Sequence, residues 1–124
     1  MLIAENPNPD GLWISAFDAG RIEIDGQAYE QAVCLKGDRI ESLDLPGAEA
    51  LDDNVFQAAL AGAAAPPEII LVGCGERQVF LHPRITARLA AAGIGLETMN
   101  TAAACRTYMI LRGEGRRVWA WLWP

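Results

Sequence analysis

The residues Gly73-Cys74-Gly75 follow a short apolar run and are the first candidates for chemistry. Open α/β sheets bind ligands at the carboxyl ends of their strands, so this position favours a binding site. Gln78 stands where a dinucleotide fingerprint needs its third glycine, and the next expected helix begins only near residue 83, which excludes a nucleotide phosphate site. A tight turn under close packing is the structural explanation of the same two glycines, and it is the one we favour.

Cys74 as a nucleophile needs a base, and the chain has a single histidine, His82. His82 directly precedes Pro83, which suits a surface residue at the start of a helix better than a catalytic partner. The three cysteines are an odd number without a Cys-x-x-Cys pair, so no metal site is expected. We therefore predict no catalytic residue and no cofactor, three free thiols, and a core-filling role for Cys34 and Cys105.

The most distinctive stretch runs over residues 97–108. Its alanines allow a helix start to lie close against a sheet, and Arg106 offers planar donors that can hold a carboxylate or an anionic ligand near the Gly73 turn. In the structural alternative, Arg106 pairs with Glu97 or Glu114 and fastens the last helix to its neighbours. The candidate ligand or partner site comprises Gly73, Cys74, Gly75, Met99, Thr101, Arg106 and Tyr108.

The last residues of the chain are expected to form a strand, and both faces of this strand are mainly apolar, which is unusual. Val118, Ala120 and Leu122 share one face, whereas the other carries Arg117 and the tryptophans at 119, 121 and 123. A strand of this kind is either covered on both faces or uses its tryptophan face to meet another chain. We predict that Trp119 is core, while Trp123 and Trp121 belong to a surface for a partner or for self-association.

Strands and helices must position these residues. The spacing of hydrophobic residues changes near residue 50 from a period of two, typical of strands, to a period of about 3.6, typical of helices. Strands are expected over residues 13–17, 21–24, 29–35, 40–43, 68–72, 95–99 and 116–123, and helices from Asp52 or Asp53 to Pro66, over 83–92, and from Asn100 or Thr101 to about 111. The apolar strand 68–72 is expected in the middle of the sheet.

This order predicts an α/β fold, a single domain over residues 1–124 with a mixed central sheet and helices packed on it. Residues 1–12 are expected as an irregular lead-in rich in turn formers, 13–50 as a β-meander, and 51–124 as the α/β part.

Charge and hydropathy narrow the classes of partner. The chain has 10 basic and 16 acidic residues, a net charge of −6, and its one lysine and scattered arginines argue against nucleic acid. No apolar stretch approaches the roughly 18 residues of a membrane span, and the first residues do not resemble a signal peptide. We expect a cytoplasmic protein with reduced thiols.

Several segments carry a distinctive pattern: residues 69–75, Gly93-Ile94, Glu97-Thr98-Met99, Thr101, Ala104, Arg106-Thr107-Tyr108 and 111–118. Together they resemble a widespread family of small proteins of unknown function, the Mth938-like family. Its relatives include a mitochondrial assembly factor of respiratory complex I and an adipogenesis-associated protein. The resemblance covers most of residues 13–122 and implies a three-layer α/β fold, but the family has no established catalytic residues. This chain departs from the family pattern at Cys74, where threonine or serine is usual, and at Met109, where asparagine is usual.

The resemblance and the lack of a catalytic constellation favour a non-enzymatic accessory or assembly-type protein that acts through protein contacts. The alternative is a small-ligand binder or enzyme built where the Gly73–Gly75 turn meets the helix start from Thr101 to Arg106. A pocket on which Thr101 and Arg106 converge favours the second hypothesis, and a filled junction favours the first.

Overall fold

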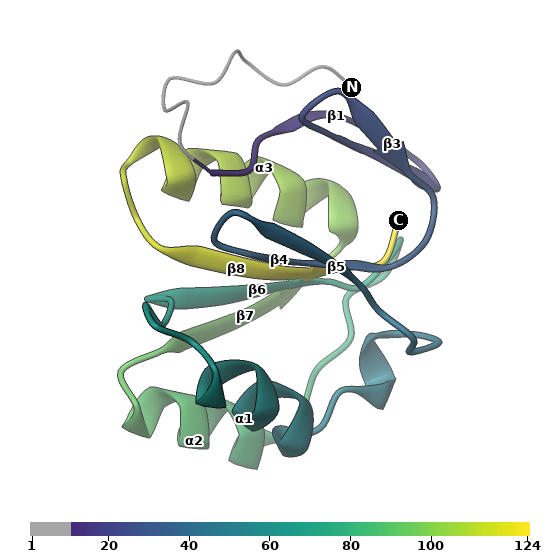
Figure 1. Cartoon of the computed structure of the whole chain (residues 1–124). Helices are drawn as coiled ribbons and strands as arrows, with labels where there is room; N and C mark the ends of the chain where they lie inside the picture. Colours follow the sequence, from purple (N-terminus) through teal and green to yellow (C-terminus); the bar gives the residue numbers. More distant parts are fainter. Residues whose placement is uncertain (1–10) are drawn as a thin grey trace.

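The strand β8 (Val118–Leu122) lies at the centre of a five-stranded sheet in the computed structural model, which describes residues 11–124 (Figure 1). It pairs antiparallel with β4 (Val33–Lys36) and parallel with β6 (Ile69–Gly73). The outer strands are β5 (Arg39–Ser42) beside β4 and β7 (Gly95–Met99) beside β6. The mixed α/β fold is thus confirmed, and β6 is an interior strand as its apolar run predicts.

All five residues of β8 are buried, and they alternate between two cores. Val118, Ala120 and Leu122 belong to one core, whereas Trp119 and Trp121 belong to the other. The helix α3 (Thr101–Gly113) covers the first face. The helices α1 (Asp53–Ala61) and α2 (Pro83–Ala91) cover the second (Figure 1). Trp119 is a core residue as predicted.

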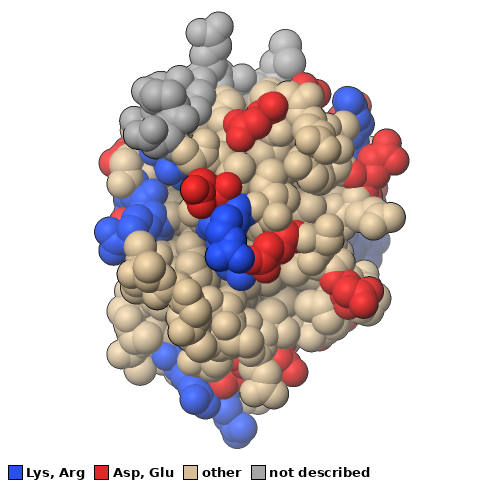
Figure 2. Space-filling view, in the orientation of Figure 1, with Lys and Arg blue, Asp and Glu red and all other residues tan. Residues whose placement is uncertain are grey.

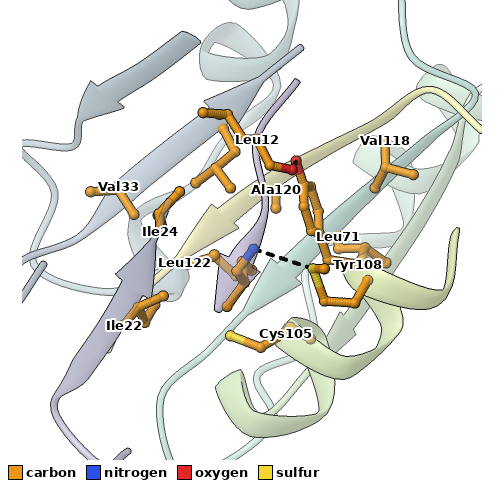
Figure 3. Close-up of a cluster of buried hydrophobic side chains, with 14 of the residues drawn as sticks. Leu12, Ile22, Ile24, Val33, Leu71, Cys105, Tyr108, Val118, Ala120 and Leu122 are labelled. Carbon is orange, nitrogen blue, oxygen red and sulfur yellow. Dashed lines mark hydrogen bonds between the residues drawn. The ribbon is translucent and has the colours of Figure 1, made fainter. Parts of the chain in front are cut away.

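A smaller sheet shares the α3 side of the molecule. It is antiparallel and contains β1 (Ile14–Asp18), β2 (Arg21–Ile24) and β3 (Gln27–Tyr29). Figure 3 shows side chains of this sheet, among them Ile22 and Ile24, facing α3 and the central sheet across one apolar cluster. The fold therefore has three layers, with the small sheet and α3 together forming one of them.

The expected strand over residues 29–35 is wrong, because these residues belong to two strands in two sheets. β3 ends at Tyr29 on the small sheet, whereas β4 begins at Val33 in the main sheet. Residues Val33, Cys34 and Leu35 are all buried, so this segment needs cover on both faces, which a half-exposed meander does not provide. The meander expected over residues 13–50 is therefore divided between the sheets.

The helices begin at the expected capping residues. Asp52 Oδ1 accepts a hydrogen bond from the Val55 amide at 3.1 Å, and Asn100 Oδ1 accepts one from the Ala103 amide at 2.8 Å. α1 ends at Ala61, before the proline pair expected to stop it, and Gly62 is its C-cap. A short 3-10 helix, η1 (Ala48–Ala50), precedes α1 and was not expected.

Three ionisable side chains are enclosed in the cores. Burial raises the pKa of the Cys34 and Cys105 thiols to about 12 and the pKa of the Tyr108 phenol to about 12. Cys34 and Cys105 are thus core fillers, as predicted, and all three cysteines of the chain are free.

The free energy of unfolding should fall as the pH rises above about 9. The ordinary pKa of a thiol is 9.0 and that of tyrosine is 10.0, whereas the folded chain holds these protons until about 12. The stabilisation is complete below the ordinary values and is lost as the pH approaches 12, and Tyr108 alone accounts for about 2 to 3 kcal/mol. Urea denaturation between pH 7 and pH 11 measures this loss, and a midpoint that stays constant to pH 11 would contradict it.

Candidate functional site

Gly73 ends β6 where two other elements press against its backbone. A Cβ atom at this position would stand 2.9 Å from Leu122 Cδ2 and 3.1 Å from the Thr101 Cα atom. The second neighbour is backbone and cannot move aside, so glycine is required here by packing. Gly75 has a φ of +89°, which makes the following turn possible. The structural explanation of the two glycines is therefore supported by the geometry of both positions.

Thr101 joins this turn to the start of α3 and to the end of the chain. Its amide donates to the Gly75 carbonyl at 2.8 Å, and its hydroxyl accepts from the Gly75 amide at 2.7 Å. The same hydroxyl donates to the Trp123 carbonyl at 2.6 Å, while the Trp123 amide donates to the Gly73 carbonyl at 3.0 Å. We call Gly73, Gly75, Thr101 and Trp123 the β6–α3 junction. Its polar groups bond one another, so the Thr101 hydroxyl has no hydrogen left to donate to a ligand.

Cys74 lies within the same turn but is not activated. Its amide donates to the Met99 carbonyl at 2.9 Å, and its Sγ lies 3.7 Å from the Val72 carbonyl and 3.8 Å from the Val79 carbonyl. Burial raises the pKa of the thiol, which keeps it protonated at neutral pH. The structure places this cysteine in a supporting position and not in that of a nucleophile.

His82 serves as the N-cap of α2. Its Nδ1 accepts the Arg84 amide at 3.0 Å, as its position before Pro83 suggests. Both polar contacts of Cys74 Sγ are to backbone carbonyls, so no Cys–His pair forms in the described part of the chain. Within residues 11–124, no group of three His, Cys, Asp or Glu side chains is placed to hold a metal ion.

A pocket of about 580 Å³ opens beside the junction. The loop between β1 and β2 forms one wall and the start of α3 forms the other. Of the seven candidate residues, only Gly75 and Thr101 line it. Its lining residues are Phe17, Ala19, Gly20, Gly75, Glu76, Asn100, Thr101, Ala102 and Pro124.

Arg106 does not reach this pocket. Its side chain is exposed, and no ion pair joins it to Glu97, to Glu114 or to another described residue. The expected ion pair with Glu97 or Glu114 is therefore wrong in this structure, and Arg106 does not join Thr101 in lining the pocket. The reason is the helical period: positions 104, 105, 108 and 109 of α3 face the core, and position 106 falls on the outer side.

Tyr108 holds the small sheet and not a ligand. Its phenol donates to the Leu12 carbonyl at 3.3 Å, and the neighbouring Met109 Sδ accepts the Ile14 amide at 3.3 Å (Figure 3). Both side chains are buried. Met109 thus accepts a hydrogen bond at the position where the family that the sequence resembles usually has asparagine. Met99 has a comparable internal contact, since its Sδ lies 3.5 Å from Thr107 Oγ1.

Trp121 and Trp123 are not an exposed association surface, and that expectation is corrected. Their exposed fractions are 2% and 8%. The segment between β5 and α1 covers them: the Trp123 indole N–H donates to the Leu45 carbonyl at 3.0 Å, and Leu51 belongs to the same core. Phe56 of α1 packs edge-on against Trp121 with ring centroids 5.1 Å apart.

Sequence reasoning missed five lining residues of the pocket, Phe17, Ala19, Gly20, Glu76 and Pro124. They come from separate regions of the chain that only the tertiary fold brings together. Asn100 was identified as a helix cap, a role that its side chain does fill. No local pattern marks the others as neighbours, so the sequence carried no signal for them.

The layers described above define a class: a mixed five-stranded sheet covered by two helices on one face and by one helix with a small antiparallel sheet on the other. This is the Mth938-like fold, because a solution structure of a Bordetella pertussis protein described as a Mth938-like domain aligns with a TM-score of 0.76. That protein is 30% identical, and the alignment covers 98% of this chain and 91% of the other. A crystal structure from Bordetella parapertussis aligns with a TM-score of 0.83 and 35% identity, over 95% of this chain and 99% of that one.

The chain belongs to the family described as protein of unknown function (DUF498/DUF598), which residues 14–123 match. A 13 kDa major membrane protein of Francisella tularensis is 42% identical over 55 residues, 44% of this chain and 45% of that protein. The NADH dehydrogenase (ubiquinone) 1 alpha subcomplex assembly factor 3 of Mus musculus is 39% identical over 57 residues, 46% of this chain and 31% of the mouse protein. The chain thus matches about half or less of the length of these two relatives. Across residues 11–124, every helix is too short or too polar to cross a bilayer.

Replacing Thr101 by valine should destabilise the fold by about 2 to 4 kcal/mol, because the Gly75 amide and the Trp123 carbonyl then lose a buried partner. Thr107→Val is the matched control, since the Thr107 hydroxyl has only a 3.5 Å contact with sulfur, and it should cost less than about 1 kcal/mol. Urea denaturation measures both values. Equal stabilities of the two variants would contradict a structural role for the junction.

Replacing Arg106 by alanine should change the free energy of unfolding by less than about 0.5 kcal/mol, as is usual for an exposed side chain without an ion pair. Thermal and urea denaturation of the variant measure the change. A loss of several kcal/mol would show that Arg106 has a structural partner after all.

Proposed function

We propose that this protein is a non-enzymatic accessory protein that acts by binding another protein during the assembly of a complex. The observation that carries the proposal is its relationship to complex I assembly factors. The Rattus norvegicus assembly factor 3 is 24% identical over 123 residues, which is 98% of this chain and 65% of that protein. The proposed partner is accordingly a subunit or an assembly intermediate of a respiratory complex.

The chemistry of the β6–α3 junction supports a role without catalysis. The Thr101 hydroxyl and amide are both bonded internally, and the Cys74 thiol is kept neutral by burial. An enzyme needs a nucleophile or base with a matched pKa and a free position for the reacting atom. These residues are used to hold the end of β6, the start of α3 and Trp123 together.

A small-ligand binder is the second candidate, and the pocket of about 580 Å³ is the observation that favours it. This volume is within the range of sites for small molecules. Glu76 is the single charged side chain among its lining residues, so a ligand would be mostly apolar or would carry a cationic group. The expected convergence of Arg106 with Thr101 is missing, which makes this candidate weaker.

We also propose the cytoplasm as the location. The three cysteines are free and lie in different elements, which fits a reducing compartment.

Affinity capture of the full tagged chain from its native cells, with chemical crosslinking and mass spectrometry, should recover a partner in stoichiometric amount. An unrelated acidic domain of similar size serves as the control bait. The partner should be retained by Ala102→Phe, a substitution that fills the pocket at the start of α3. The proposal would be contradicted if no partner is enriched while a small molecule binds the purified chain and Ala102→Phe abolishes that binding.

A further inference from the structure

A second hollowed region lies away from the junction, where β6 and β8 begin. Two hollows of about 380 Å³ and 310 Å³ adjoin there, because Gly37, Ala65 and Trp119 line both of them. One hollow extends along the end of α1, and the other extends toward the end of α3. We call the combined region the basic groove.

The charge of the basic groove is opposite to that of the whole chain. Five of the ten basic residues line it, against one acidic residue, Asp38, so its walls carry a net charge of +4 in a chain of net charge −6. Figure 2 shows basic side chains gathered at the left of the molecule, over the side where α3 ends. The five basic residues are Lys36, Arg39, Arg112, Arg116 and Arg117.

Most of these cations are held in place by neighbouring groups. Arg117 Nε donates to the Pro66 carbonyl at 3.0 Å, and Arg112 Nε donates to the Leu12 carbonyl at 3.4 Å. A guanidinium carries five N–H donors in a fixed plane, so a single bond from Nε leaves the Arg117 terminal nitrogens to meet a carboxylate. Such a preorganised donor loses less conformational entropy on binding than a free surface arginine. Glu68 partly offsets the charge at this end: the hydrogen bond from the Arg117 amide, at 2.9 Å, and the nearby charges of Arg117 and Arg116 lower the pKa of its carboxyl.

Glu41 reduces the charge at the other end of the groove but leaves Arg39 accessible. Its carboxylate pairs with Lys36 at 2.9 Å and with Arg39 at 3.3 Å. The Arg39 side chain is 72% exposed, and an exposed pair of this kind contributes little to stability. Arg39 can therefore exchange Glu41 for a ligand carboxylate at small cost. Arg116 is exposed and can also meet a ligand carboxylate.

The floor of the basic groove is apolar. Trp119 lies beneath it with the Lys36 ammonium 5.9 Å from its ring centroid, and alanines from the end of α1 and the following loop form one side. Small side chains leave room for apolar groups of a ligand, which would gain contact with the alanines and the indole edge.

We propose that the basic groove binds an acidic peptide segment of a partner protein, with carboxylates on the arginines and apolar side chains on the alanine-lined floor. This inference rests on the proposed function and names the surface through which the partner would be bound. A nucleic acid is the less suitable polyanion, because the net charge of −6 repels a long polyanion outside the groove and the walls offer only a few cations. A short acidic segment has carboxylates at the spacing of single residues and also supplies the apolar groups that the floor requires.

The probe is an acetylated 12-residue peptide in which Asp and Glu alternate with Leu and Ala, followed by NMR titration of the labelled full chain. The Trp119 indole N–H and the amides of Gly37 and Ala65 should shift, and the affinity should fall as salt is raised. The double variant Arg39→Glu/Arg116→Glu should weaken binding at least about 10-fold, through loss of two charge contacts. The matched control Arg84→Glu/Arg106→Glu changes the net charge equally at exposed positions outside the groove and should bind like the original chain.

Absence of shifts at the groove residues, or equal weakening by the control variant, would overturn the proposal. Tighter binding of a 12-nucleotide single-stranded DNA at the same residues would overturn it in favour of nucleic acid. Thermal denaturation verifies that each variant is folded. If the captured partner is retained by the groove variant, the groove assignment fails and the proposed function stands, whereas failure to capture any partner with the original chain counts against the proposed function itself.

Discussion

The burial of β8 on both faces is the constraint on which the rest of the structure depends. Its five side chains are apolar and buried, so the sheet must be covered on both sides. The tryptophan face requires a deep layer, which α1, α2 and the segment before α1 provide. The face of Val118, Ala120 and Leu122 has smaller side chains, and α3 lies directly over it. Each outer layer of the fold thus covers one face of β8.

Several residues that the sequence suggests for a ligand site have structural roles instead. Thr101, Gly73 and Gly75 close the carboxyl end of β6, and Tyr108 attaches the small sheet to α3. What remains for function lies on the surface, in the pocket beside the junction and in the basic groove at the other end of the strands. This division suits a protein that binds others, because neither surface region depends on a reactive group.

The sequence predicted the helices and most strands because hydrophobic period and capping residues are local signals. It failed at residues 29–35, where the choice between one strand and two depends on which sheet each half joins. It failed for Trp123 because the covering segment around Leu45 is 78 residues away. It failed for the ion pair expected of Arg106 because position 106 lies on the outer side of α3. The first two errors concern long-range contacts, which periodicity does not encode.

The central claim, that the β6–α3 junction is a closed structural unit and not a flexible ligand site, is tested most directly by amide hydrogen exchange. The amides of Gly75, Thr101 and Trp123 each donate within the junction. They should exchange as slowly as the amide of Ala120 in β8, through unfolding of the whole domain. Exchange of these three amides at rates typical of exposed loops would contradict the account.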